Sequence, residues 1–548
     1  MKTISKSTLT NWQGTAFFLG LIMIFGLFIR VYYVPFEVPI VTDGYLSFVY
    51  AVKTVFDSSL PVGYTVTNSG WSNLLSLVFV SVDKMDPLYL MNVQRITSVV
   101  LSTITVIPMF FIFRKFVNVK FALLGSLMIA VEPRLLLISI EGINYTLFFF
   151  IFVLTIALFL KKTNVSLFFS FVCIAFLTVV RYEGILLVIP LSIIYLNKFR
   201  NKRSILLFLG MIFTMMIILL AIGELRIEAT KDICDLNSFG DYTCGRNGYE
   251  GLFNSLEFLN RAIISEDTTS IIENMDTSHD EVLQMPSYSI LDAFEKLFKF
   301  MGLILVPFFA FFVILNLISR IKIKKLLKWN FNFITILFSS GVFLLPALYA
   351  YVRNIDESRY LMVFIPLICI LSISLSESIR NKISKDKRIF VVLILFIVIT
   401  SIGFIEIKER DHIHDLESFK VSQEIVSLTD VTNSYNQDGY LKPAILFKHW
   451  PELPSSEADR GGKITNKQFF KISTVDYKNV EEFIESSRES KLEYMVVDEQ
   501  NELFHDLRIN SDEYPFLKKV FDSKNLKYTN EFKIFQIDYQ IFDLTIQE

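Results

Sequence analysis

The sequence has little charge for its length and no excess of either sign. Only 20% of its 548 residues are charged, and the formal net charge is −2. No basic patch interleaved with aromatic side chains occurs, which argues against a protein that binds nucleic acid or another polyanion. No self-similarity with a period of about 20–50 residues appears either, which excludes a solenoid.

Apolar residues are what the sequence has in abundance: they make up 52% of the chain and include 54 Phe. They fall in blocks of roughly 17–23 residues, long enough for helices to cross a bilayer core of about 30 Å. The first block, Gly14 to Tyr33, is too long for the core of a signal peptide and lacks a small-residue cleavage site. We therefore expect an α-helical polytopic membrane protein with about eleven transmembrane helices, near 14–34, 93–113, 119–138, 143–160, 165–180, 184–197, 204–223, 298–319, 332–351, 359–376 and 388–405. A shorter apolar stretch, 73–82, is expected at the membrane interface.

The distribution of basic residues predicts the orientation. With a cytoplasmic N-terminus, every predicted cytoplasmic connection is basic and the opposite connections are acidic or mixed. The protein is thus expected to be a multi-pass plasma-membrane protein, with external segments at 35–92, 224–297 and 406–548. The last segment is polar and alternates strand-like and helix-like runs, which predicts a small external α/β C-terminal domain, 406–548, after a transmembrane domain, 1–405.

Cysteine is scarce, with four residues, and its placement agrees with this topology. Cys173 and Cys369 lie inside predicted spans, where they act as small apolar side chains. Cys234 and Cys244 both lie in the external segment 224–297, where a disulfide is permitted and would close a short loop. A metal-binding pair is the alternative, but no histidine lies close to them, so we expect the disulfide.

Ionisable residues gather at the predicted outer ends of the helices. They are Asp43, Glu132, Arg134, Glu141, Arg181, Glu183, Arg353, Asp356, Glu357 and Arg359. Ionisable groups near membrane depth are costly, so each needs a partner, water or a function. We expect these helix ends to surround one external cavity.

The arginines allow two interpretations. Arg181 in VVRYEGILL could pair with Glu183 at the interface, and Arg353 to Arg359 could be a loop whose charges balance one another. Alternatively, Arg181, Arg353 and Arg359 bind an anionic headgroup, because a guanidinium matches the geometry of phosphate.

Asp43, in VTDGYLSFVYA, also has two possible roles. It could cap a surface helix running from Gly44 to Phe56, or form an Asp-Gly turn. It could also be a general base, and a cap would hold such a carboxylate in place.

These stretches resemble the GT-C class of polytopic glycosyltransferases. The resemblance covers roughly 14–405 and rests on VTDGYLSFVYA, EPRLLLISIEGINYTLFFF, VVRYEGILLVIPL and ESRYLMVFIPL together with the predicted topology. The last two are similar to stretches in archaeal and bacterial members described as RgtA/B/C/D-like or dolichyl-phosphate-mannose–protein mannosyltransferase-like. Many members carry Asp-x-Asp or Asp-x-Glu in the first external loop, whereas Asp43 is followed by Gly44 and Tyr45, which weakens a metal-binding interpretation. Oligosaccharyltransferases of the class carry a Trp-Trp-Asp motif that is absent here, so that subtype is not expected.

The resemblance implies transfer of a sugar from a polyprenyl- or dolichyl-phosphate carrier to a protein, lipid or glycan acceptor on the outer face, with inversion. No cofactor is certain, and a divalent metal is possible but not favoured. Asp43 is the expected base with Glu141 as its helper, while Arg359, Arg353 and Arg181 are the expected phosphate ligands. Glu183, Asp356, Glu357 and Tyr45 are expected to support them. A transporter or lipid flippase is the main alternative, although the charges collect at helix ends and not near the bilayer midplane. A non-catalytic receptor that binds a partner through its C-terminal lobe is a third.

Overall fold

The fold was analysed in a computed structural model. It describes residues 6–58, 69–234, 290–306, 308, 330–352, 357–383, 387–408, 412–428, 440–450, 477, 479–488, 492–498, 507, 509–510 and 513–547. The chain divides into two compact units. Unit 1 comprises 1–34, 60–75 and 95–409, and unit 2 comprises 35–59, 76–94 and 410–548.

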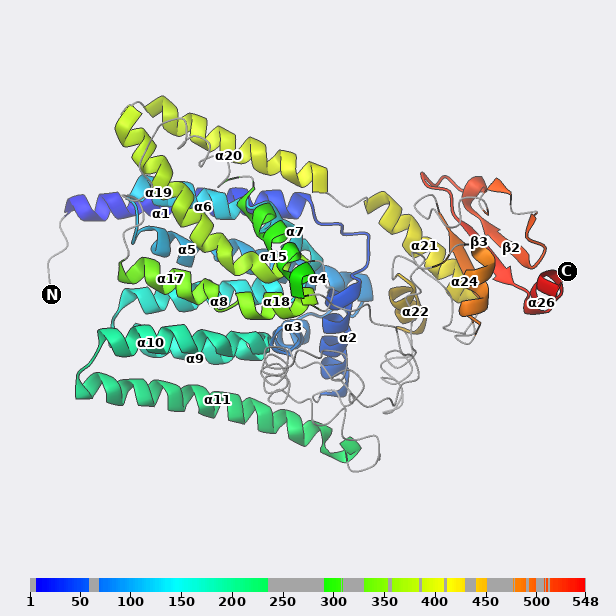
Figure 1. Ribbon diagram of the computed structural model, residues 1–548, viewed down its shortest axis with the longest axis horizontal. Coiled ribbons are helices and arrows are strands. Elements are labelled where there is room, and N and C mark those ends of the chain that lie inside the picture. The colour runs from blue at the N-terminus through cyan, green and yellow to red at the C-terminus, as the bar shows by residue number, and fades with distance from the viewer. Residues whose placement is uncertain are drawn as a thin grey trace. The chain divides into compact units, whose positions relative to one another are not determined.

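Unit 1 is built of apolar helices. They are α1 (Lys6–Tyr32), α5 (Val106–Phe113), α6 (Val119–Ala130), α7 (Pro133–Glu141), α8 (Tyr145–Lys161), α9 (Asn164–Val180), α10 (Val188–Lys198), α11 (Lys202–Cys234), α15 (Ile290–Leu305), α17 (Phe331–Gly341), α18 (Leu344–Val352), α19 (Ile365–Ile383) and α20 (Lys387–Lys408), with the 3-10 segments η1 (Tyr182–Leu187) and η3 (Ser358–Phe364). Helix α9 packs against both α8 and α11, and these helices lie in successive rows (Figure 1). Helices α3 (Gly70–Val80) and α4 (Pro87–Ile104) contribute residues to both units.

Length and composition identify membrane-spanning candidates among the described residues. Five helical stretches are long and apolar enough to cross a membrane, or six if the bent pair α6–α7 forms one span. Four further apolar helices are shorter, including α8 and α9. The expected multi-helix membrane protein is therefore confirmed, while the count of about eleven spans stays a prediction.

Several expected spans are interrupted. The stretch 119–138 bends by 44° between α6 and α7, where Pro133 occupies the first position of α7. The expected span 332–351 is broken between α17 and α18, and 93–113 is divided between α4 and α5. A sequence window measures hydropathy, which does not change at such a break, so the interruptions are invisible to it.

A buried arginine stabilises the bend between α6 and α7. The Arg30 side chain of α1 is fully buried, and its Nε donates to Ser102 Oγ at 3.0 Å. Its Nη1 donates to the carbonyls of Gly26 and Ala130, so it satisfies a carbonyl at the C-terminal end of α6. On the other side of the bend, Glu132 caps α7 by accepting from the Leu135 N–H at 2.8 Å. The two buried charges thus supply partners for backbone groups that the bend leaves unpaired.

Unit 2 contains the small mixed part near the C-terminus. Strands β1 (Tyr494–Val497), β3 (Lys533–Ile537) and β2 (Leu517–Asp522) form a three-stranded antiparallel sheet in the order β1-β3-β2. The register pairs Met495 with Phe535, and a bulge interrupts β2 between Lys519 and Phe521. The helices described in this unit are α2 (Thr42–Asp57), α21 (His412–Leu428), α22 (Leu441–His449), α24 (Val480–Ser486) and α26 (Tyr539–Gln547). The expected α/β character of the C-terminal region is confirmed at this level.

Segments of the first expected external loop belong to unit 2 as well. The Tyr45 hydroxyl of α2 donates to the Lys442 carbonyl at 3.1 Å, and Gln94 donates to the Gly44 carbonyl at 2.9 Å. Trp450 stacks on Phe48 of the same helix, with ring centres 6.3 Å apart. Contacts between residues far apart in the sequence therefore join α2 to the C-terminal helices of this unit.

The proposed capping role of Asp43 is wrong. Helix α2 begins at Thr42, two residues earlier than expected, and its N-cap is Val41, with no side-chain capping bond. Asp43 lies instead in the first turn, where a carboxylate interacts favourably with the helix dipole. The residue before it, Thr42, has a φ of 53°, which is rare for a β-branched residue.

We predict that Gly184→Ala destabilises the protein much more than Gly210→Ala. A Cβ at Gly184 in η1 would lie 2.7 Å from the Leu177 carbonyl carbon of α9, whereas nothing lies within 4 Å of one at Gly210. Overpacking of this kind costs about 1–3 kcal/mol. Thermal unfolding in detergent measures the difference, and equal midpoints for the two variants would contradict the tight α9–η1 contact.

Candidate functional site

Two arginine-bearing turns of unit 1 share one local plan. Arg181 precedes η1, which leads into α10 with Pro190 in its first turn. Arg359 lies in η3, which leads into α19 with Pro366 in its first turn. A proline ring clashes with the carbonyl four residues before it and has no N–H, so it favours a helix start and disfavours a regular α-turn upstream. The sequence thus explains why Arg181 lies next to a 3-10 segment and Arg359 lies within one.

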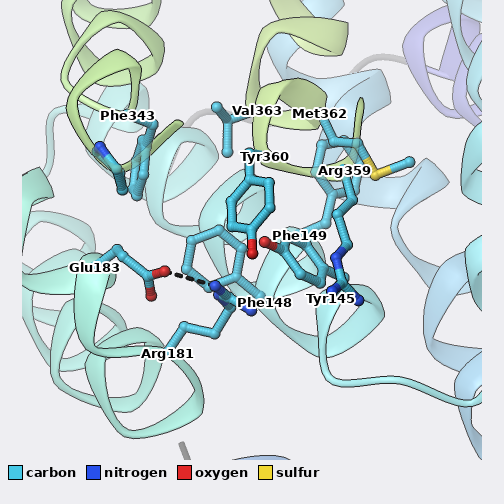
Figure 2. A pocket seen from close by; sticks show the side chains of 11 residues that line it. Tyr145, Phe148, Phe149, Arg181, Glu183, Phe343, Arg359, Tyr360, Met362 and Val363 are labelled. Carbon is cyan, nitrogen blue, oxygen red and sulfur yellow. Dashed lines mark hydrogen bonds and ion pairs between the residues drawn. The ribbon is translucent and has the colours of Figure 1, made fainter. Parts of the chain in front are cut away.

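Both guanidinium groups lie close to the same tyrosine ring. The Cζ of Arg181 is 4.2 Å from the ring centre of Tyr145, and the Cζ of Arg359 is 5.3 Å from it. Tyr360 packs edge-on against Tyr145, with ring centres 6.0 Å apart, and is 5.8 Å from each guanidinium. Figure 2 shows Arg181 and Tyr360 pointing toward each other within the pocket. An aromatic face attracts a cation by about 2 kcal/mol where water is excluded. This attraction stabilises the two positive charges beside the Tyr145 ring.

The first residues of α3 contact the backbone beside Arg181 and the backbone before Tyr145. A Cβ at Gly70 would lie 2.8 Å from the Val180 backbone, so only glycine lets α3 approach the end of α9 beside Arg181. The Trp71 indole N–H donates to the Gly142 carbonyl at 2.8 Å. Gly142 ends α7 with a φ of 70°, three residues before Tyr145. Helix α3 therefore contacts the backbone next to both Arg181 and Tyr145.

Each guanidinium has a carboxylate partner from its own turn. Arg181 Nη2 lies 2.5 Å from Glu183 Oε1, and both side chains are largely buried, at 12% and 7% exposed. Arg359 forms an ion pair with Glu357, whose side chain is 41% exposed. The expected local pairing of Arg181 with Glu183 is thus present. It does not exclude anion binding, because a guanidinium has more donors than one carboxylate oxygen uses.

The pocket between these groups joins charged and apolar surfaces. Its empty space, which opens in part to solvent, amounts to about 350 Å³. The charged or hydroxyl-bearing lining consists of Arg181, Glu183, Arg359, Tyr145 and Tyr360. The apolar lining consists of Phe148, Phe149, Phe343, Pro346, Met362 and Val363 (Figure 2). Such a lining fits an amphiphile with an anionic head.

The Tyr145 hydroxyl has no hydrogen-bond partner among the residues that the structure describes. The residue is only 5% exposed, and its oxygen is buried. A buried hydroxyl without a partner costs about 1–3 kcal/mol. The hydroxyl is thus available to a ligand in the pocket.

The structure brings together some of the expected site residues. Arg181, Glu183 and Arg359 line one pocket, and Glu357 pairs with Arg359. Glu141 lies at the exposed C-terminal end of α7 and is not among the residues lining this pocket. Asp43 and Tyr45 belong to unit 2.

Other expected residues lie outside the described part of the chain. Arg353, Asp356 and Cys244 are among them, and of Cys234 only its backbone at the end of α11 is described. The disulfide between Cys234 and Cys244 stays a prediction. Within the described residues, no group of three or more His, Cys, Asp or Glu side chains could hold a metal ion.

Sequence reasoning missed the two tyrosines. Tyr360 directly follows Arg359, as Tyr182 follows Arg181, so the repeated Arg-Tyr pair was a usable signal. Tyr145 begins α8 and has no such signal, because its role depends on α8 packing against α9.

Comparisons with known proteins found solved structures but no sequence family. No family model and no curated protein match the chain. The oligosaccharyltransferase of Archaeoglobus fulgidus in its apo form is 12% identical, over 88% of this chain and 69% of that one, with a TM-score of 0.43. The archaeal oligosaccharyltransferase AglB from the same organism, in complex with an inhibitory peptide and a dolichol-phosphate, is 13% identical over the same shares, with a TM-score of 0.42. These neighbours fall in the GT-C class that the sequence resembles. No residue role is transferred from them.

We predict that Tyr145→Phe leaves stability unchanged or raises it, whereas Tyr145→Leu lowers it. Phenylalanine keeps the ring faces beside both guanidiniums and removes a buried hydroxyl that has no partner among the described residues. Leucine removes the aromatic faces, at a cost of about 2 kcal/mol. Unfolding midpoints of the two variants test this, and an equal loss in both would mean that the hydroxyl is satisfied within the protein.

Proposed function

We propose that the protein is a membrane glycosyltransferase that moves a sugar from a polyprenyl- or dolichyl-phosphate carrier to a hydroxyl-bearing acceptor on the outer face. The observation that supports it is the pair of guanidiniums, Arg181 and Arg359, beside one tyrosine in a pocket with an apolar lining. Arginine pairs are suited to phosphate, and apolar side chains to the first carbons of a lipid chain.

The reaction needs charge stabilisation on the leaving group. The acceptor oxygen forms a bond to the anomeric carbon, and the bond from that carbon to the phosphate oxygen breaks, with its electron pair passing to the phosphate. Preorganised positive charge at the phosphate lowers the barrier to this step. Arg181 and Arg359 supply that charge, and Arg353, which shortly precedes Arg359 in the sequence, is a further proposed ligand.

The proposed base is Asp43, with Glu141 as its helper. A single displacement with one base gives inversion at the sugar. Asp43 is in the first turn of α2, where a carboxylate interacts favourably with the helix dipole. Thr42 beside it has a strained backbone, and strain of this kind tends to occur at functional positions.

We predict that Arg359→Gln weakens use of the donor by at least about tenfold and leaves use of the acceptor nearly unchanged, because the lost interaction is with the phosphate. Arg359→Lys keeps the charge without the bidentate geometry, so its use of the donor should lie between that of the wild type and that of Arg359→Gln. Transfer from a radiolabelled polyprenyl-phosphate sugar in membranes measures both. Arg203→Gln, at the exposed start of α11, is the matched control. Equal losses toward donor and acceptor would indicate a structural role for Arg359.

We predict that Asp43→Asn lowers kcat by about a hundredfold or more with little change in the donor KM, as expected when a general base is lost. Asp83→Asn, an exposed residue of the same unit, is the matched control. Full activity of folded Asp43→Asn would overturn the assignment of the base.

A further inference from the structure

The arginine groups of the pocket are electrically balanced. Arg181 is paired with Glu183 and Arg359 with Glu357, so these four described side chains sum to zero. The balance is also local in sequence, because 181–183 and 353–359 each contain as many acidic as basic residues. A site built only to hold an anion as tightly as possible would lack these carboxylates.

The proposed reaction changes the charge of its lipid. The donor is a phosphate diester with a single negative charge, and the released carrier is a monoester with about −1.5 to −2 charges at pH 7. The acceptor proton passes to the base, and the phosphate keeps the electron pair of the broken bond. Two unopposed guanidiniums would therefore bind the product more tightly than the donor, and turnover would be limited by release.

We infer that Glu183 and Glu357 are competing counterions, which make the site favour the singly charged donor over the doubly charged product. This inference rests on the proposed function. Glu183 holds Arg181 from a distance of 2.5 Å and is itself largely buried, so an incoming phosphate must share or displace an existing ion pair. Each added negative charge on the ligand is repelled by the same carboxylates.

Two buried oxygens that have no hydrogen-bond partner among the described residues support an exchange of partners. Glu183 Oε2 is buried and accepts no hydrogen bond from the described residues, so one oxygen alone keeps the pair. The Tyr145 hydroxyl, also without a partner among them, lies in the same pocket. A phosphate that takes over the guanidinium of Arg181 finds this additional donor, whereas Glu183 does not use it. Glu183 is thus a specificity-determining residue that acts through Arg181.

The test measures binding of two small amphiphiles to the full-length protein in detergent. Farnesyl phosphate is the monoester probe, and farnesyl methyl phosphate is the diester probe. Glu183→Gln should raise affinity for the monoester by about tenfold and affinity for the diester by clearly less. Glu357→Gln should act in the same direction more weakly, because its side chain is 41% exposed. Glu295→Gln on the exposed face of α15 is the matched control and should change neither affinity.

The outcomes separate this inference from the function on which it rests. The phosphate site itself is wrong if the wild-type protein binds neither probe. It is also wrong if the Arg181→Gln and Arg359→Gln variants bind both probes as tightly as the wild type does. If the wild type binds both probes through the arginines and the ratio of their affinities is unchanged in Glu183→Gln and Glu357→Gln, the counterion role is wrong and the phosphate site stands. Glu357 lies at a partly exposed position, so its variant answers the question even if Glu183→Gln fails to fold.

A kinetic measurement adds a second readout. In Glu183→Gln, the inhibition constant of farnesyl phosphate should fall and kcat should fall with it, while the donor KM falls or stays unchanged. A purely structural role for Glu183 would instead lower the amount of active enzyme and leave the inhibition constant as it is in the wild type.

Discussion

The ion pair between Arg181 and Glu183 is the interaction on which the candidate site depends. A guanidinium that is only 12% exposed would be strongly destabilising without a counterion, and the partner comes from two residues further along the same turn. The pair forms locally, so it does not depend on the exact approach of distant helices. The face of Tyr145 then fixes the guanidinium from α8. Arg359 is arranged in the same way around the same ring, with its own partner Glu357.

The same physical rule explains the breaks in the apolar helices. A break inside a membrane unit leaves backbone N–H and C=O groups without partners, and no water is available to satisfy them. Arg30 and Glu132 meet that need at the bend between α6 and α7, and the proline after each 3-10 segment needs no partner for its missing N–H. Buried charges in this unit thus have two distinct tasks. Those at the α6–α7 bend complete the backbone bonding, whereas Arg181 and Arg359 lie beside a pocket.

Local patterns predicted much of this molecule, and long-range contacts account for what they missed. Apolar blocks indicated the helices, and short turns between them placed Arg181 and Glu183 together, because two residues in one turn cannot separate. Tyr145 was not found, since only the packing of α8 beside α9 brings it to Arg181. The grouping of α2 with the C-terminal helices likewise depends on contacts such as Tyr45 with Lys442, which leave no trace in a sequence window. Asp43 was wrongly assigned as a cap because the helix begins earlier, at Thr42, whose φ of 53° is disfavoured for its residue type.

An anion site inside an apolar unit must satisfy two opposing requirements. While empty, it must carry little net charge, because two desolvated guanidiniums near one ring would repel each other and destabilise the fold. While occupied, it must offer enough positive charge to attract a phosphate. Internal carboxylates satisfy the first requirement at the expense of affinity, so stability of the empty protein and tight binding of a highly charged ligand are opposed. Under the proposed function, this opposition is useful, since the ligand that must leave is the more highly charged one. The glutamates that let the arginines lie largely out of water would then also promote release of the product.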